Sequence, residues 1–110
     1  MKPDFDFPSA MTLRGYVESV ATELGVEPAA TWSEYGPPSS AYVALADRAP
    51  RYPHRLLMLS WTSTDGWALA LEPQRAEEPV VLAHWRDSVY LAPGTLATLV
   101  HEALGRQEKR

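Results

Sequence analysis

The part of the sequence that could do chemistry most directly is the polar segment 47–55. It carries three arginines and a histidine against a single aspartate. Arginine forks bind phosphate and carboxylate groups, so the segment predicts a small-ligand or anion-binding site. Its candidate residues are Arg48, Arg51, His54 and Arg55, with Tyr52 beside them. The same composition fits a solvated connection between two strands, stiffened by prolines, and we favour that interpretation.

The three histidines, His54, His84 and His101, are not spaced as metal ligands. His101 and Glu102 begin like the helix of a zinc protease, but Gly105 stands where the second histidine of that motif must be. The chain has no cysteine, which excludes disulfides, thiolate metal sites and a cysteine nucleophile. We therefore expect no metal and no cofactor.

Motifs for nucleophilic catalysis and phosphate binding are absent from the sequence as well. No Gly-x-Ser-x-Gly or Ser-x-x-Lys pattern occurs, and the six glycines form no phosphate-binding loop. A triad assembled from distant residues stays open, because such sites form in space and not in sequence. We predict no catalytic residues and favour a non-catalytic protein, with an enzyme that uses the segment 47–55 as the alternative.

The composition is typical of one soluble globular domain. The chain has 110 residues, of which 45% are hydrophobic and 22% charged, and its net charge is −4. This acidic balance argues against nucleic acid as a partner, because nucleic-acid binders carry a basic excess. The longest hydrophobic run, 41–46, is too short to span a membrane, and no signal peptide is visible. We therefore expect a cytoplasmic protein with no membrane partner.

Two helices are predicted, one near each end of the chain. Apolar residues in 13–24 recur at helical spacing, and Gly25 follows where a left-handed residue ends a helix. The same spacing returns in 96–104, with Pro93 near the start and Gly105 near the end.

Five strands are predicted between the helices, at 30–35, 41–46, 56–62, 67–71 and 80–85. A run of strands flanked by helices predicts an α+β domain over 9–105, with an antiparallel meander sheet of four to five strands between an N-terminal and a C-terminal helix. Residues 1–8 and 106–110 are expected to be tails.

The Asp65-Gly66 pair predicts a hairpin, and the hairpin assigns the faces of the sheet. Loops of two and of four residues give the same alternation of side chains. One face then carries Leu57, Leu59, Trp61, Ala68 and Ala70. The other carries Leu56, Met58, Ser60, Thr62, Trp67, Leu69 and Leu71. Both faces are substantially apolar, so we expect both to be covered.

Two helices on one face would leave the other face to a partner, because a large exposed apolar patch usually marks an interaction surface. The residues expected to bind that partner are Met58, Trp67, Leu69 and Leu71. We therefore expect a protein-interaction or self-associating module, either a homodimer or a complex with another protein. The alternatives are one helix on each face, or an N-terminal segment that lays Phe5 and Phe7 across the second face.

Several segments of this chain resemble a small actinobacterial domain family of unknown function. They are LRGYV at 13–17, AYVAL at 41–45, LMLSW at 57–61, DGWALA at 65–70, and Ala92-Pro93 before the last helix. The resemblance extends over most of residues 13–104. It implies a single domain in the bacterial cytoplasm, and it brings no activity, substrate, cofactor or catalytic residue with it.

Overall fold

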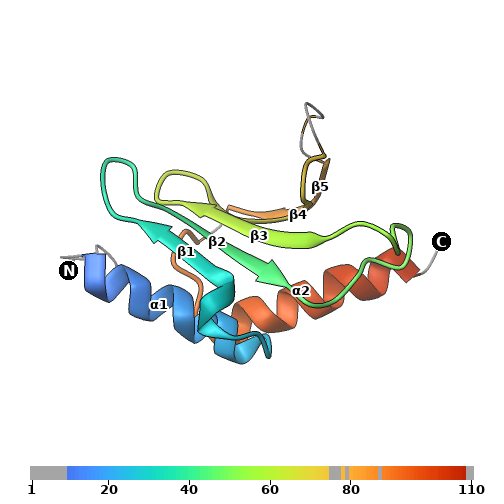
Figure 1. Ribbon diagram of the computed structural model, residues 1–110, viewed down its shortest axis with the longest axis horizontal. Helices are drawn as coiled ribbons and strands as arrows, with labels where there is room; N and C mark the ends of the chain where they lie inside the picture. The colour runs from blue at the N-terminus through green and yellow to red at the C-terminus, as the bar shows by residue number, and fades with distance from the viewer. Residues whose placement is uncertain (1–9, 75–77, 79, 87, 109–110) are drawn as a thin grey trace.

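The computed structural model describes residues 10–74, 78, 80–86 and 88–108, which form one sheet and two helices (Figure 1). The elements are α1 Ala10–Glu23, a 3-10 turn Pro28–Ala30, β1 Thr31–Glu34, β2 Ser40–Leu45, β3 Leu57–Thr62, β4 Gly66–Leu71, β5 Val80–Trp85 and α2 Pro93–Glu108. Neighbouring strands pair antiparallel in the order β1-β2-β3-β4-β5. The predicted α+β meander with a helix at each end is therefore confirmed.

Helix α1 ends as its sequence predicts. Gly25 has φ +78°, a left-handed conformation that costs glycine nothing. The backbone N–H of Val26 donates to the carbonyl of Ala21 at 2.9 Å, and the N–H of Gly25 donates to the carbonyl of Thr22 at 3.1 Å. These two bonds form a Schellman motif, which satisfies carbonyls that the end of a helix leaves free.

Helix α2 is longer than predicted. It runs through Gly105 to Glu108, so residues 106–108, which we expected in a tail, are helical. A glycine inside a helix costs only about 1 kcal/mol relative to alanine. No proline follows Gly105, whereas Pro28 stands three residues after Gly25 and stops α1 from continuing.

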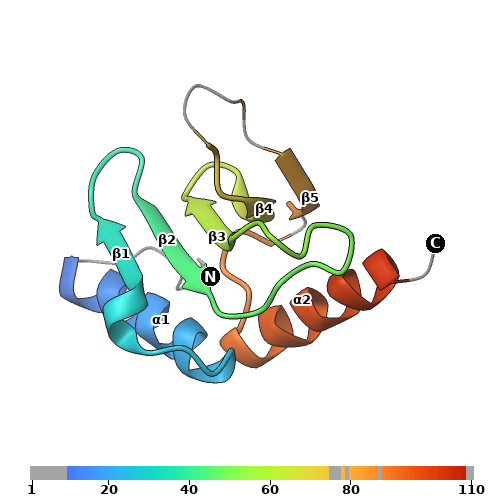
Figure 2. The ribbon, with the colours of Figure 1, turned by 45° about the vertical axis from the view of Figure 1, so that its right-hand side comes forward.

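Both helices lie on one side of the sheet. Figures 1 and 2 show α1 and α2 beneath the strands, and within the described residues no helix lies above them. We call the covered side the helix face and the other side the open face. The structure thus departs from the alternative with one helix on each side. The tail at 1–8 and the alternative with Phe5 and Phe7 lie outside the described residues.

The hairpin between β3 and β4 has a three-residue loop. Thr62 pairs with Gly66 and Trp61 pairs with Trp67, which leaves residues 63–65 as the loop. Gly66 has φ +83°, as expected for the left-handed residue that closes such a hairpin. An odd loop length moves every side chain of β4 to the opposite face. The predicted assignment of faces is therefore wrong, and the helix face holds Leu57, Leu59, Trp61, Trp67, Leu69 and Leu71 together.

Two tryptophans and a tyrosine occupy the centre of the core. The rings of Trp61 and Trp67 lie 6.1 Å apart, and the Tyr16 ring from α1 lies 6.2 Å from Trp67. Trp61 Nε1 donates to the carbonyl of Val89 at 2.8 Å. Trp67 Nε1 donates to the Tyr16 hydroxyl at 3.1 Å, and this hydroxyl donates to the carbonyl of Leu91 at 2.6 Å. These bonds tie α1, β3 and β4 to the connection that leads into α2.

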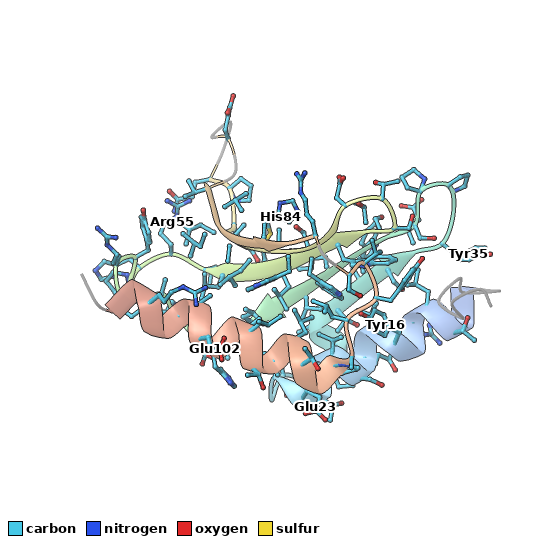
Figure 3. All side chains as sticks on the ribbon, turned by 180° about the vertical axis from the view of Figure 1, so that it is seen from behind. Tyr16, Glu23, Tyr35, Arg55, His84 and Glu102 are labelled. Carbon is cyan, nitrogen blue, oxygen red and sulfur yellow. The ribbon has the colours of Figure 1, made fainter. Side chains whose placement is uncertain are left out.

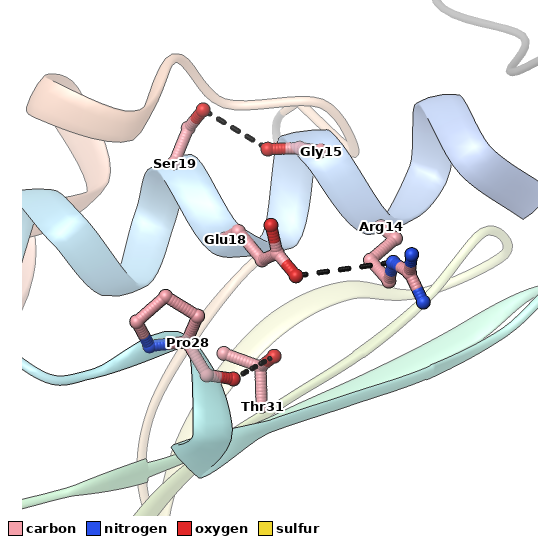
Figure 4. A network of polar contacts seen from close by, with 6 residues as sticks. All are labelled: Arg14, Gly15, Glu18, Ser19, Pro28 and Thr31. Carbon is pink, nitrogen blue, oxygen red and sulfur yellow. Dashed lines mark hydrogen bonds and ion pairs between the residues drawn. The ribbon is translucent and has the colours of Figure 1, made fainter.

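The exposed surface around α1 carries ordinary polar contacts (Figure 4). Arg14 Nε lies 3.8 Å from the carboxylate of Glu18 one turn later, and the Ser19 hydroxyl donates to a backbone carbonyl one turn earlier at 3.0 Å. At the start of β1 the Thr31 hydroxyl donates to the carbonyl of Pro28 at 2.7 Å. Exposed ion pairs of this kind contribute little to stability.

Candidate functional site: the open face of the sheet

One row of paired residues crosses the open face from edge to edge. It consists of Trp32, Tyr42, Ser60, Ala68 and His84, one residue from each strand. Paired residues of antiparallel strands point to the same side, and Figure 3 shows His84 on the side away from the helices. We call these residues the cross-strand row. It passes from large aromatic rings on β1 and β2 to small side chains on β3 and β4.

Exposed apolar side chains stand at both edges of the open face. Trp32 on β1 is 52% exposed, and Val81 on β5 is 55% exposed. Ala70, which pairs with Val81, is only 2% exposed although no described helix covers it. A register shift between Leu69 and Ala70 bends the sheet there, and β5 turns away from the helices (Figure 1). The open face is therefore curved, with apolar edges and a centre of small side chains.

A cavity of about 200 Å³ with a mixed polar and apolar lining lies on the open face beside the β3–β4 hairpin, and its polar side chains are those of Ser60, Thr62, Asp65 and His84. The Arg86 Nε donates to the His84 ring, 3.1 Å from Nδ1. A hydroxyl, a carboxylate and an imidazole are the groups of a catalytic triad. Among the described residues, however, no hydrogen bond joins Ser60 to His84, and the Thr62 hydroxyl accepts the Asp65 N–H at 3.0 Å. The cavity therefore brings together polar side chains that could contact a ligand.

Hydrogen bonds link three residues at the end of the open face away from the β3–β4 hairpin: Tyr42, Glu72 and Arg55. The Tyr42 hydroxyl donates to the Glu72 carboxylate, and the Arg55 Nη2 donates to the Glu72 carbonyl at 3.0 Å. Burial, together with the bond to Glu72 and its charge, raises the pKa of Tyr42 to about 12. At neutral pH the hydroxyl therefore stays protonated and keeps donating. The contact holds the Tyr42 ring in place within the cross-strand row.

The four predicted anion-binding residues do not form one cluster. Arg48, Arg51 and His54 are exposed, while Arg55 is half-buried and bonded to the Glu72 carbonyl. Arg48 lines a depression of about 360 Å³ together with His101 of α2, and the other three residues do not contribute to it. Backbone hydrogen bonds fold the segment into successive turns. Segment 47–55 is thus an ordered connection between β2 and β3, and anion binding by it stays a prediction.

The residues predicted to bind a partner are divided between the two faces. Trp67, Leu69 and Leu71 are fully buried on the helix face, so they form core and no surface. Met58 stands on the open face and is half-buried. Trp32 lies outside the predicted set, although it falls within the strand predicted at 30–35 and is the one aromatic residue of β1.

The described part of the chain also contains no metal-binding cluster. No three histidine, aspartate or glutamate side chains there are arranged to hold an ion. Nor does any described helix combine the length and the apolar character that crossing a bilayer requires.

Comparison with known proteins adds a family. Residues 16–102 match the model of a family described as a family of unknown function, DUF6292. The match begins within α1, ends within α2 and includes all strands of the sheet. Searches of curated proteins and of solved structures gave no significant match. Any function must therefore be argued from the open face itself.

Proposed function

The chain belongs to the family of unknown function DUF6292, and we propose that it is a non-catalytic interaction module in which two copies pack open face to open face. The observation that carries the proposal is that both helices lie on the same side of the sheet, so that no described helix covers the open face. The open face is left with an exposed tryptophan at one edge and an exposed valine at the other, and packing against a second copy would cover both. The proposed setting is the bacterial cytoplasm, which suits a chain without cysteine.

The charges at the edges favour a second copy as the partner. Glu34 ends β1 at one edge of the open face, and Arg86 follows β5 at the other. A surface with opposite charges at its two edges can complement a turned copy of itself. A surface of one sign would instead require a partner of the other sign. The distribution therefore fits a homotypic contact.

The size of the open face predicts a weak, reversible dimer. Five strands, spaced by about 4.8 Å and each contributing about five residues of about 3.4 Å, give a projected area of roughly 400 Å² per copy, and the curvature at β5 reduces the part that can touch a second copy. Standard interfaces bury about 800 Å² per partner. We therefore expect a dissociation constant in the micromolar range, in keeping with a reversible contact.

Sedimentation velocity from about 1 to about 1000 µM protein tests the proposal directly. We expect a concentration-dependent shift from monomer to dimer in the wild-type chain. Trp32→Ala should weaken the dimer about tenfold or more, because aromatic residues dominate the energy of such contacts. Trp32 is half exposed, so this variant should keep the circular dichroism spectrum of the wild type.

Tyr35→Ala is the matched control. Tyr35 is 47% exposed, but it lies in the β1–β2 loop, where alternation turns it away from the open face (Figure 3). Its loss should leave the dissociation constant unchanged. A wild-type chain that stays monomeric at every concentration overturns the proposal, and so does a Trp32→Ala variant that dimerises like the wild type.

A further inference from the structure

We infer that the two-fold axis of this dimer runs along β3, so that β1 of each copy lies over β5 of the other. The inference rests on the proposed function and adds the orientation and the residues that set it. In a two-fold interface one patch must fit itself. Because β3 is the middle strand of the sheet, rotation about it exchanges β1 with β5 and β2 with β4.

The cross-strand row is complementary to itself under this rotation. Tyr42 on β2 comes to lie opposite Ala68 on β4 of the second copy, so a large ring meets the smallest side chain of the row. Trp32 on β1 comes to lie opposite His84 on β5, an aromatic ring against an imidazole. Ser60 on β3 meets its own equivalent at the axis. A large ring therefore faces a small side chain at Tyr42 and Ala68, and two different aromatic rings meet at each edge across the space between packed sheets.

The other face-to-face arrangement, with the axis across the strands, fits poorly. It places β1 over β1 and β4 over β4, so Trp32 meets Trp32 while Ala68 meets Ala68. Two indoles would then hold the sheets apart at one edge, and two alanines would leave a gap at the centre. A gap of that kind forfeits the dispersion contacts that a packed interface needs. The sizes of the side chains thus favour the axis along β3.

The charged residues at the two edges also favour the axis along β3. Glu34 pairs with Ser40 in the row next to the cross-strand row. Arg86 reaches this row from the other edge, since Trp85 pairs with Trp67 and the Arg86 Cα lies 3.8 Å from the position of a Cβ on Gly66. Within the described residues, neither Glu34 nor Arg86 has an ion pair. Rotation about β3 brings Glu34 of each copy over Arg86 of the other, at two equivalent places.

Charge reversal tests this orientation. Glu34→Arg alone and Arg86→Glu alone each place like charges together at both contacts, and each should weaken dimerisation about tenfold or more. The variant that carries both changes restores opposite charges and should return to within about threefold of the wild type. The matched controls are Glu102→Arg and Arg106→Glu, the same charge changes at exposed positions of α2, and they should leave the dimer unchanged.

Cross-linking between introduced cysteines gives a second readout of the orientation. The wild-type chain has no cysteine, so only the introduced thiols can react. A Glu34→Cys chain is mixed with an Arg86→Cys chain, together with a bismaleimide that spans about 10 Å, the separation of packed sheets. The mixed dimer has two edge contacts. At one of them Arg86 of the first chain faces Glu34 of the second, and at the other the two introduced thiols face each other. The mixture should give linked dimers. Either chain alone should give few, because equivalent positions lie at opposite edges of the two packed sheets, about 22 Å apart.

The outcomes separate this inference from the function on which it rests. A wild-type dimer that Trp32→Ala weakens, but that neither charge reversal affects, overturns the orientation and leaves the homotypic module standing. The same holds if either cysteine variant alone is linked as well as the mixture. A wild-type chain that is monomeric throughout overturns both proposals.

Discussion

The helix face and the open face are built from alternate residues of the same strands, and they differ sharply in burial. On β3, Leu57, Leu59 and Trp61 are at most 1% exposed, whereas the alternate residues Met58, Ser60 and Thr62 are half-buried and two of these three are polar. Burying a large apolar side chain contributes about 1.5–3 kcal/mol. The helix face therefore supplies most of the burial that stabilises the fold, and the open face is the one that we propose to bind a second copy. Substitutions that separate these roles test the comparison.

The largest contrast is expected between two tryptophans on opposite faces. Trp67→Ala should lower the free energy of unfolding by about 3–5 kcal/mol, because Trp67 is fully buried and its loss leaves a cavity. Trp32→Ala should change it by less than about 0.5 kcal/mol, since Trp32 is half exposed. Urea unfolding at a concentration that keeps the chain monomeric measures both. Equal losses would show that the open face also stabilises the monomer.

The glycine that closes the β3–β4 hairpin is expected to give the next largest effect. Gly66 has φ +83°, and a Cβ there would lie 2.7 Å from the carbonyl oxygen of Trp85. Gly66→Ala should therefore cost about 2–4 kcal/mol, the sum of left-handed strain and steric overlap.

Gly25→Ala separates these two causes. Gly25 has φ +78°, but a Cβ on this residue would meet no atom within 4 Å, so only the strain of about 1–2 kcal/mol should remain. Chemical denaturation of both variants gives the difference. If Gly66→Ala costs no more than Gly25→Ala, the close approach of β5 to this hairpin does not constrain the sheet.

The same hairpin shows which parts of the fold follow from local sequence. The strand at Val80–Trp85 matches its predicted bounds, and α1 ends at the predicted glycine, because alternation and helix caps are local signals. The assignment of faces failed although the hairpin itself was predicted. Asp65-Gly66 is compatible with a loop of two, three or four residues, and one residue more or less exchanges the faces of β4.

The candidate site was harder to predict than the elements that form it. The cross-strand row joins residues from 32 to 84, so it depends on the register of all five strands at once. No short motif encodes such a row. The charged residues of segment 47–55 are close in sequence, which is why the segment predicts an anion-binding site. In the fold, Arg48 lines a depression beside α2, whereas Arg55 donates to the Glu72 carbonyl. Proximity in sequence was a poor guide to proximity in the fold.

Two tyrosine hydroxyls on opposite faces extend the comparison to single hydrogen-bonding groups. On the helix face, the Tyr16 hydroxyl accepts a hydrogen bond from Trp67 and donates one to the carbonyl of Leu91. On the open face, the Tyr42 hydroxyl donates a hydrogen bond to the Glu72 carboxylate. Tyr16→Phe should cost about 1–2 kcal/mol at pH 7, because it leaves a part-buried donor and acceptor without partners. Tyr42→Phe should cost less, since water can replace the hydroxyl on the open side.

The pH dependence of these losses tests their origin. Burial raises the pKa of Tyr16 to about 12, above its ordinary value of 10. Below pH 10 the folded and unfolded chains both hold this proton. Between pH 10 and 12 the unfolded chain releases it first, so the contribution of Tyr16 to stability falls as the pH rises. The difference in unfolding free energy between the wild type and Tyr16→Phe should therefore narrow across that interval. A constant difference would mean that the hydroxyl is solvated in the folded chain, and that the helix face is less completely closed than its buried tryptophans indicate.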